Sequence, residues 1–244
     1  MKAGTVKITS LKGTPILPVM PEISIPEKKH GFKEPGSAIT HLIGGVLAVM
    51  AAPLLLLKTA ASSNPVHIAA MAVFMASMIL LYAASTLYHS LDINEKVNKR
   101  LKKLDHMMIS VLIAGSYTPV CLIALGGRTG TGLLILIWSL ALAGIIFKAF
   151  WVTCPKWISS VLYIVMGWLC IIALPQLLSA LPFAAFMWLL SGGLMYTIGG
   201  VIYALKLPLF NLRHKNFGSH EIFHLFVMAG SFCHFMMMYL YLAA

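Results

Sequence analysis

The apolar residues of this chain come in long blocks, separated by short polar stretches rather than alternating with them. A helix that crosses a bilayer needs about 20 apolar residues in succession, and several blocks reach that length. Charged residues make up only 10% of the chain and hydrophobic residues 59%, whereas a soluble domain carries about 25% charged residues. The sequence therefore predicts one membrane-embedded, all-α bundle.

Turn and charge signals divide this bundle into seven spans. The predicted transmembrane helices cover residues 37–57, 66–90, 105–125, 131–151, 157–174, 183–205 and 220–242. The stretches between them are rich in Gly, Pro, Ser, Asn or charged residues, which favour turns. Residues 1–35, rich in proline and lysine, are predicted to form a cytoplasmic tail, and residues 36–244 the seven-span domain. We expect no cleavable signal peptide, because the first 25 residues lack an apolar core.

The basic residues predict an orientation. When Lys148 is counted with its nearest loop, the tail and the second, fourth and sixth loops carry 16 lysines and arginines, and the other side carries only Lys58 and Arg128. Short cytoplasmic loops are enriched in such residues. We therefore expect the N-terminus in the cytoplasm and the C-terminus outside.

The net charge of +11 does not indicate a nucleic-acid partner. Its basic residues lie in the tail and in loops beside apolar spans, where anionic lipid attracts them, and no aromatic residues are interleaved with them. The four cysteines are widely spaced and form no CxxC motif. They are predicted to be packing residues rather than disulfide partners or metal ligands.

Ionisable residues inside spans are costly and usually serve function. They are His41, His89, Asp105, His106, His220, Glu221, His224 and His234. In the predicted topology, the second span ends near His89, the third begins at Asp105, and the seventh begins at His220 and His224. These residues are therefore expected in one layer near the cytoplasmic surface, with Ser85 one helical turn from His89.

The spacing within this layer predicts zinc. His220 and His224 are four residues apart and face the same way on a helix, and His89 supplies a third imidazole. Three protein ligands with an open fourth position are typical of catalytic zinc. Calcium or magnesium would require more carboxylates than are present.

Other interpretations of the polar residues remain open. The segment 220–224 matches HExxH, in which Glu221 would be the base of a zinc protease. His234, about 15 Å deeper along the helix, is expected to be a hydrogen-bonded core residue rather than a ligand. His41 is either near the metal ligands or merely interfacial. His30, His67 and His214 are expected in loops or at the interface.

Three ordered motifs in this frame resemble the hemolysin III branch of the progestin and adiponectin receptor (PAQR) family, which is related to alkaline ceramidases. They are Glu34 followed by Thr40-His41; Ser85 and His89, followed by a basic loop and Leu104-Asp105; and His220 with His224. The likeness runs from Glu34 to the C-terminus. Two positions depart from the receptors' pattern: His106 stands where they tend to have tyrosine, and Glu221 follows the first histidine of the last motif.

The resemblance implies a zinc ion on His89, His220 and His224, with Asp105 holding a water and Ser85 close by. It also implies an integral protein of the bacterial inner (plasma) membrane. The leading hypothesis is a hydrolase of lipid amides or esters. In it, Asp105 is the catalytic base, and Ser85 supports the oxyanion or the water network. Its partner would be a membrane lipid, and the sequence specifies no oligomeric state. The alternatives are a receptor-like lipid sensor with structural zinc and a cytolytic protein.

Overall fold

The structure of the protein, a computed structural model, describes residues 33–61, 64–205 and 218–243. Within these ranges every regular element is a helix. The predicted tail, except for its last three residues, and His30 and His214 lie outside the described residues.

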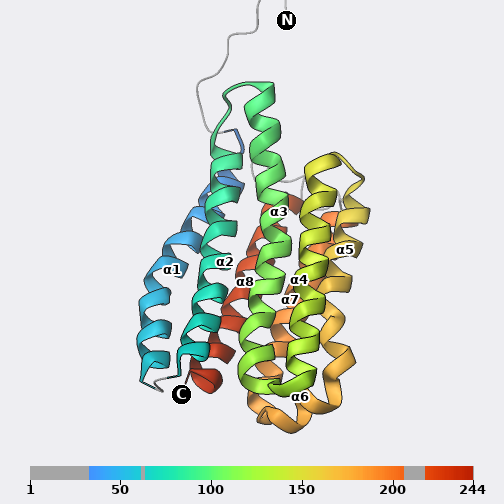
Figure 1. The fold of residues 1–244 in the computed structure, drawn as a ribbon. Helices are drawn as coiled ribbons and strands as arrows, with labels where there is room; N and C mark the ends of the chain where they lie inside the picture. Colours follow the sequence, from blue (N-terminus) through green and yellow to red (C-terminus); the bar gives the residue numbers. More distant parts are fainter. Residues whose placement is uncertain (1–32, 62–63, 206–217, 244) are drawn as a thin grey trace, which may run out of the picture. The chain divides into compact units, whose positions relative to one another are not determined.

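Among the described residues, seven helical segments are long and apolar enough to cross a membrane, which confirms the predicted fold class (Figure 1). The elements are α1 (Pro35–Ala60), α2 (Pro65–Ser90), α3 (Glu95–Pro119), the π-helical turn η1 (Val120–Leu125), α4 (Gly127–Phe150), α5 (Lys156–Trp168), the 3-10 turn η2 (Leu169–Ala173), α6 (Leu174–Ala180), α7 (Phe183–Leu205), α8 (Ser219–Met237) and the π-helical turn η3 (Met238–Leu242).

The third helix begins ten residues before the predicted start at Asp105. Residues 95–104, predicted to form a loop, are the first turns of α3. The side chain of Asn94 accepts a hydrogen bond from Val97 N at 2.9 Å and caps the helix, with Glu95 in its first turn. Hydropathy marked only the apolar part of this helix, whereas capping determines where it begins.

The predicted end of the fifth span was also wrong. The fifth span does not end at residue 174 but continues through η2 and α6 to Ala180. Pro175 lies in the first turn of α6, where its missing N–H is not required. Lys148, counted with the fourth loop, is fully buried in the last turn of α4.

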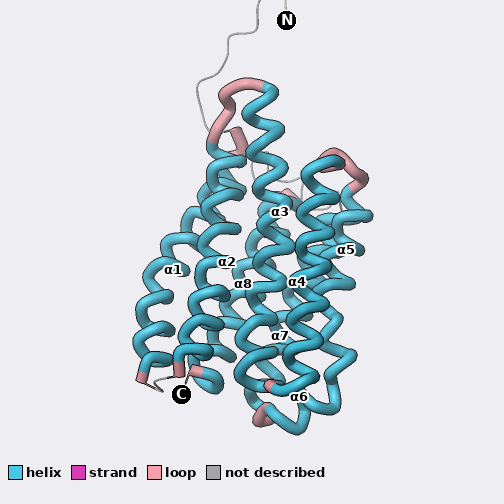
Figure 2. Tube along the Cα trace, in the orientation of Figure 1, coloured by secondary structure: helices cyan, strands magenta, loops and turns pink. Residues whose placement is uncertain are grey.

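Successive helices pack beside one another, and α8 closes the bundle by packing against both α7 and α1 (Figures 1 and 2). Glycines allow two pairs of neighbouring helices to approach closely. A Cβ at Gly115 of α3 would lie 2.1 Å from Ser77 Oγ of α2, and one at Gly144 of α4 would lie 2.6 Å from Ser110 Oγ of α3. Small residues at such crossings are typical of membrane bundles.

The outer faces of the helices are apolar. Met50 and Leu57 of α1 and Ile135 of α4 are more than 60% exposed. Water-soluble bundles bury such side chains, whereas lipid accepts them. The protein is thus a multi-pass membrane protein. The end of α2 and the beginnings of α3 and α8 lie at one end of the bundle, opposite the C-terminus (Figure 1).

Candidate metal centre

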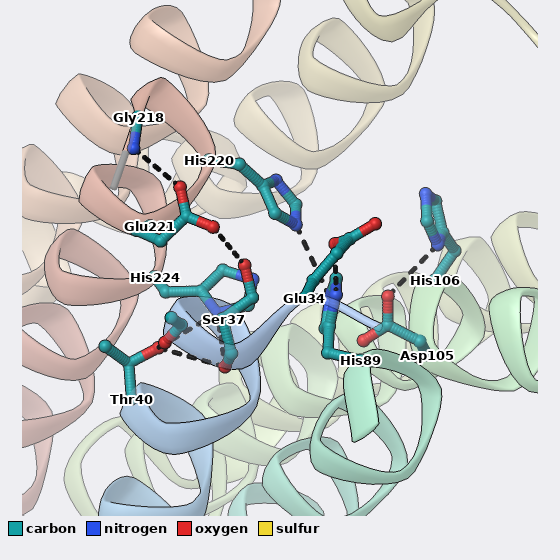
Figure 3. Close-up of polar contacts among 11 residues, drawn as sticks. Glu34, Ser37, Thr40, His89, Asp105, His106, Gly218, His220, Glu221 and His224 are labelled. Atoms are coloured by element: carbon teal, nitrogen blue, oxygen red, sulfur yellow. Dashed lines mark hydrogen bonds and ion pairs between the residues drawn. The ribbon is translucent and has the colours of Figure 1, made fainter. Parts of the chain in front are cut away.

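Three histidines meet at this end of the bundle and are called the histidine cluster below. His89 lies in the last turn of α2, and His220 and His224 lie in the first turns of α8. One ring nitrogen from each lies within 4.8 Å of the other two, and the Nε2 atoms of His89 and His220 are 3.4 Å apart (Figure 3). The structure therefore brings together the residues that spacing selected as ligands.

The residue before α1 orients His89. Nδ1 of His89 lies 2.6 Å from Glu34 Oε2, and Glu34 N donates to the carbonyl oxygen of His89 at 3.0 Å. The hydrogen bond from His89 lowers the pKa of Glu34, although partial burial opposes this shift. A carboxylate at Nδ1 places the ring proton there and leaves the Nε2 lone pair directed at the cluster.

Residues at the start of α1 orient the ring of His224 through its Nδ1 atom. Nδ1 of His224 lies 3.3 Å from the carbonyl oxygen of Ser37 and 3.3 Å from Thr40 Oγ1. The carbonyl can only accept, so Nδ1 carries the proton and Nε2 is left as the ligand atom. Nδ1 of His220 is buried without a hydrogen-bond partner in the described part of the chain.

Glu221, which the HExxH pattern suggests as a catalytic base, makes two hydrogen bonds at the start of α8. Its Oε1 accepts a hydrogen bond from Ser37 Oγ at 2.7 Å, and its Oε2 accepts one from Gly218 N at 2.8 Å (Figure 3). Both oxygens are therefore engaged in capping α8 and tying it to α1. This geometry favours a structural role for Glu221 over a role as catalytic base.

His41 lies against the cluster. Its ring stacks on His224 with the centroids 3.7 Å apart and the planes 11° apart, and Tyr82 meets its edge. It is buried, and among the described residues neither of its ring nitrogens has a hydrogen-bond partner.

A cavity lies beside the cluster within the bundle. Its walls are mostly apolar, and its polar lining includes His220, His224, Asp105 and Ser85. Both predicted catalytic residues thus face the same space as His220 and His224.

Asp105 and Ser85 differ in their partners. Asp105 is buried, with Oδ2 at 3.2 Å from Nδ1 of His106, which also lies 2.9 Å from the carbonyl oxygen of Lys102. Its second oxygen lies on the side of His89 (Figure 3). The buried hydroxyl of Ser85 has no partner among the described residues.

His234 lines the same cavity farther along α8. Its Nε2 lies 3.3 Å from the carbonyl oxygen of Leu189, and its ring occupies the space left by Gly192, where a Cβ would come within 2.2 Å of it. The expectation of a hydrogen-bonded core histidine is confirmed.

Comparison with known proteins identifies the family. Residues 30–235 match the family described as "Haemolysin-III related". The chain belongs to the hemolysin III family. Within it, the chain is 42% identical to Hemolysin-3 of Bacillus cereus over 200 residues, which cover 82% of this chain and 87% of that protein. It is 41% identical to the Hemolysin-3 homolog of Bacillus subtilis (strain 168) over 199 residues, which cover 82% and 89%.

A more distant relative links the hemolysin III family to the receptors. The adiponectin receptor protein of Drosophila melanogaster is 26% identical over 228 residues, which cover 83% of this chain and 49% of that protein. The resemblance to the hemolysin III branch of the PAQR family is thereby confirmed, as is a multi-pass protein of a bacterial membrane.

Sequence reasoning overlooked how much α1 contributes to the site. Glu34 and Thr40 were noticed only as part of a family motif, and Ser37 was not singled out. A signal was nevertheless present, since residues 34, 37 and 41 recur at helical spacing beside one another.

Proposed function

We propose that the histidine cluster binds Zn²⁺ and that the protein is a zinc-dependent hydrolase of lipid amides or esters. The observation that carries this proposal is the convergence of three imidazoles from α2 and α8, of which His89 and His224 are buried and His220 is partly buried, beside an apolar cavity that His220 and His224 line. Two of these rings are held through Nδ1 by acceptors, which leaves Nε2 for a metal.

The donor set fits zinc. Imidazole nitrogens are preferred zinc ligands, and the acceptors behind His89 and His224 are the kind of outer partners that zinc-binding histidines have. The crowding of three imidazoles, which is unfavourable without a metal or a proton between them, points the same way. A zinc ion held here supplies Lewis acidity, which polarises a carbonyl group and activates water for attack.

Asp105 is the proposed base. Its Oδ2 is engaged with His106, so Oδ1 is the oxygen that accepts the proton of the attacking water. The unpartnered hydroxyl of Ser85 is placed to donate to the oxygen on which negative charge develops. The apolar walls of the cavity hold the hydrocarbon part of the lipid and keep bulk water away.

The orientation is also a proposal. The charge distribution favours a cytoplasmic tail over residues 1–35, a membrane domain over 36–244 and a histidine cluster on the cytoplasmic side. A reporter fused after Ala244 should be active only outside the membrane, and cysteines introduced in the α2–α3 connection should be labelled only from the cytoplasm. The reverse labelling pattern would contradict this orientation.

The function is tested with purified full-length protein and a panel of ceramides, N-acyl amides and lysophospholipid esters. We expect about one zinc ion per chain, product release that stops after chelation, and recovery when zinc is restored. A protein that holds zinc but turns over no lipid of the panel would instead be a sensor in which zinc is structural.

A further inference from the structure

A second polar group faces the same cavity from the other side, at the N-terminal end of α5. It consists of Lys148 of α4 and Ser159 and Ser160 of α5, called the lysine–serine group below. Both serines line the cavity. The proposed metal centre uses none of these residues.

The lysine of this group is buried without an anion. Lys148 is fully buried, and its Nζ donates to Ser159 Oγ and, at 3.1 Å, to Cys154 Sγ. Among the described residues, no carboxylate forms an ion pair with it. A buried ammonium group is costly without an anion beside it, and an anion bound at the neighbouring serines would lower that cost.

The two serines differ in their hydrogen bonds. Ser159 Oγ accepts from Lys148 and also lies 3.3 Å from Cys154 Sγ, so it is already engaged within the group. Ser160 is 3% exposed, and its hydroxyl has no partner among the described residues. Such a hydroxyl group beside a cation and a helix N-terminus forms a suitable site for an oxyanion.

Other charges in the region favour an anion as well. Nζ of Lys156 lies 4.2 Å from the ring centroid of Tyr203, which lines the cavity, and therefore adds positive charge at this end. Asp105 is the only acidic residue that lines the cavity within the described part of the chain, and its carboxylate is paired with His106.

We propose that the lysine–serine group binds the oxyanion of an anionic lipid head group, a carboxylate or a phosphate, while the lipid chain occupies the apolar cavity. The inference deepens the proposed function, because it names the class of lipid for the same cavity. It concerns binding alone, and so it can hold or fail whether or not hydrolysis occurs.

The test measures binding to full-length protein in neutral detergent. The probes are 9,10-dibromostearate, its uncharged methyl ester, and dibrominated oleoyl lysophosphatidate. Bromine quenches tryptophan, and Trp168 lines the cavity, so a Trp168→Phe variant identifies the quenching that arises there. We expect both anionic probes to bind at least about tenfold more tightly than the ester, the size of one hydrogen bond to a charged group.

Two variants with matched controls assign the preference to named atoms. Ser160→Ala removes a hydroxyl that makes no internal hydrogen bond and should reduce the anion preference about tenfold. Ser110→Ala removes another unpartnered buried hydroxyl, outside the cavity lining, and should leave the preference intact. Lys148→Met should abolish the preference. Lys58→Met, the same change in a lysine that contacts Tyr239 instead, should preserve it.

Three outcomes would overturn the inference. The first is equal affinity for stearate and its ester. The second is an anion preference that survives both Ser160→Ala and Lys148→Met but disappears with EDTA, which would place the anion on a metal. The third is full displacement of the probes by inorganic phosphate, which would make free phosphate the ligand. Lipid turnover is assayed separately, so loss of the preference and loss of hydrolysis are distinguishable.

Discussion

The histidine cluster and His234 are buried histidine sites beside one cavity, yet their surroundings differ. In the cluster, the ends of two helices bring three imidazoles within 4.8 Å of one another, and α1 places acceptors behind two of them. His234 is a single ring, held by the carbonyl oxygen of Leu189 and packed beside Tyr196. Burial of a histidine in a membrane helix is therefore not by itself a sign of metal binding; convergence and orienting acceptors are.

The largest expected effect is a difference in zinc content between a variant that lacks His224 of the cluster and one that lacks His234. We expect His224→Ala to lose most of its zinc and to unfold at a lower temperature, because the metal would no longer join α2 to α8. His234→Ala should retain about one zinc ion per chain, since its ring faces a carbonyl group rather than the cluster. Elemental analysis of the purified variants checks this. Equal zinc content in the two variants would show that the ligands are assigned wrongly.

The roles of the two carboxylates beside the cluster, Asp105 and Glu221, can be distinguished by matched substitutions. Asp105→Asn keeps the shape of the side chain but cannot accept a proton. It should lower lipid turnover about 10²- to 10⁴-fold, the usual contribution of general-base catalysis, while zinc content stays unchanged. Glu221→Gln is the matched control and should reduce turnover much less, since both oxygens of Glu221 are engaged in capping. The opposite ranking would favour the protease-like mechanism.

Local patterns in the sequence were sufficient for some of these features. Apolar block length predicts all seven spans, and the spacing of four between His220 and His224 places both rings on one face of α8. Such properties depend only on residues near one another in the chain. The start of α3 was missed because seven of its first ten residues are charged or polar, so hydropathy could not reveal them.

The features that the sequence did not reveal depend on how segments far apart in the chain approach one another. Glu34 contacts His89, 55 residues away, and Ser37 contacts Glu221, 184 residues away. Helical spacing places these residues of α1 beside one another, but it does not reveal which distant residues they contact. Lys148 was overlooked for the same reason: at the end of a span it resembles a loop lysine, and only the packing of α4 on α5 encloses it.

The acceptors behind the cluster should matter less than its ligands. Glu34→Gln replaces the carboxylate at Nδ1 of His89 with a neutral amide, which holds the ring less firmly and makes its Nε2 a weaker donor. We expect about a 10- to 100-fold loss of zinc affinity, the range found when such outer partners are changed. Competition with a zinc chelator measures it. Glu95→Gln, in the first turn of α3, removes the same charge and should leave zinc affinity unchanged. If both variants lost the same affinity, Glu34 would act only through its negative charge and not through its contact with His89.

The smallest expected effect concerns the packing of His234. A Cβ at Gly192 would lie 2.2 Å from Cδ2 and 2.4 Å from Nε2 of the His234 ring, so Gly192→Ala must displace that ring. We expect a loss of about 1–3 kcal/mol in unfolding free energy, as for other overpacked cores. Gly193→Ala is the control, because its Cβ would meet no atom within 4 Å, and alanine favours a helix.

Thermal unfolding of Gly192→Ala and Gly193→Ala, and of Gly192→Ala combined with His234→Ala, separates the effect of the clash from the effect of the helix backbone. If the clash is the cause, the double variant should be less destabilised than the two single changes add up to. Simple additivity would mean that Gly192 acts through the helix backbone and not through His234.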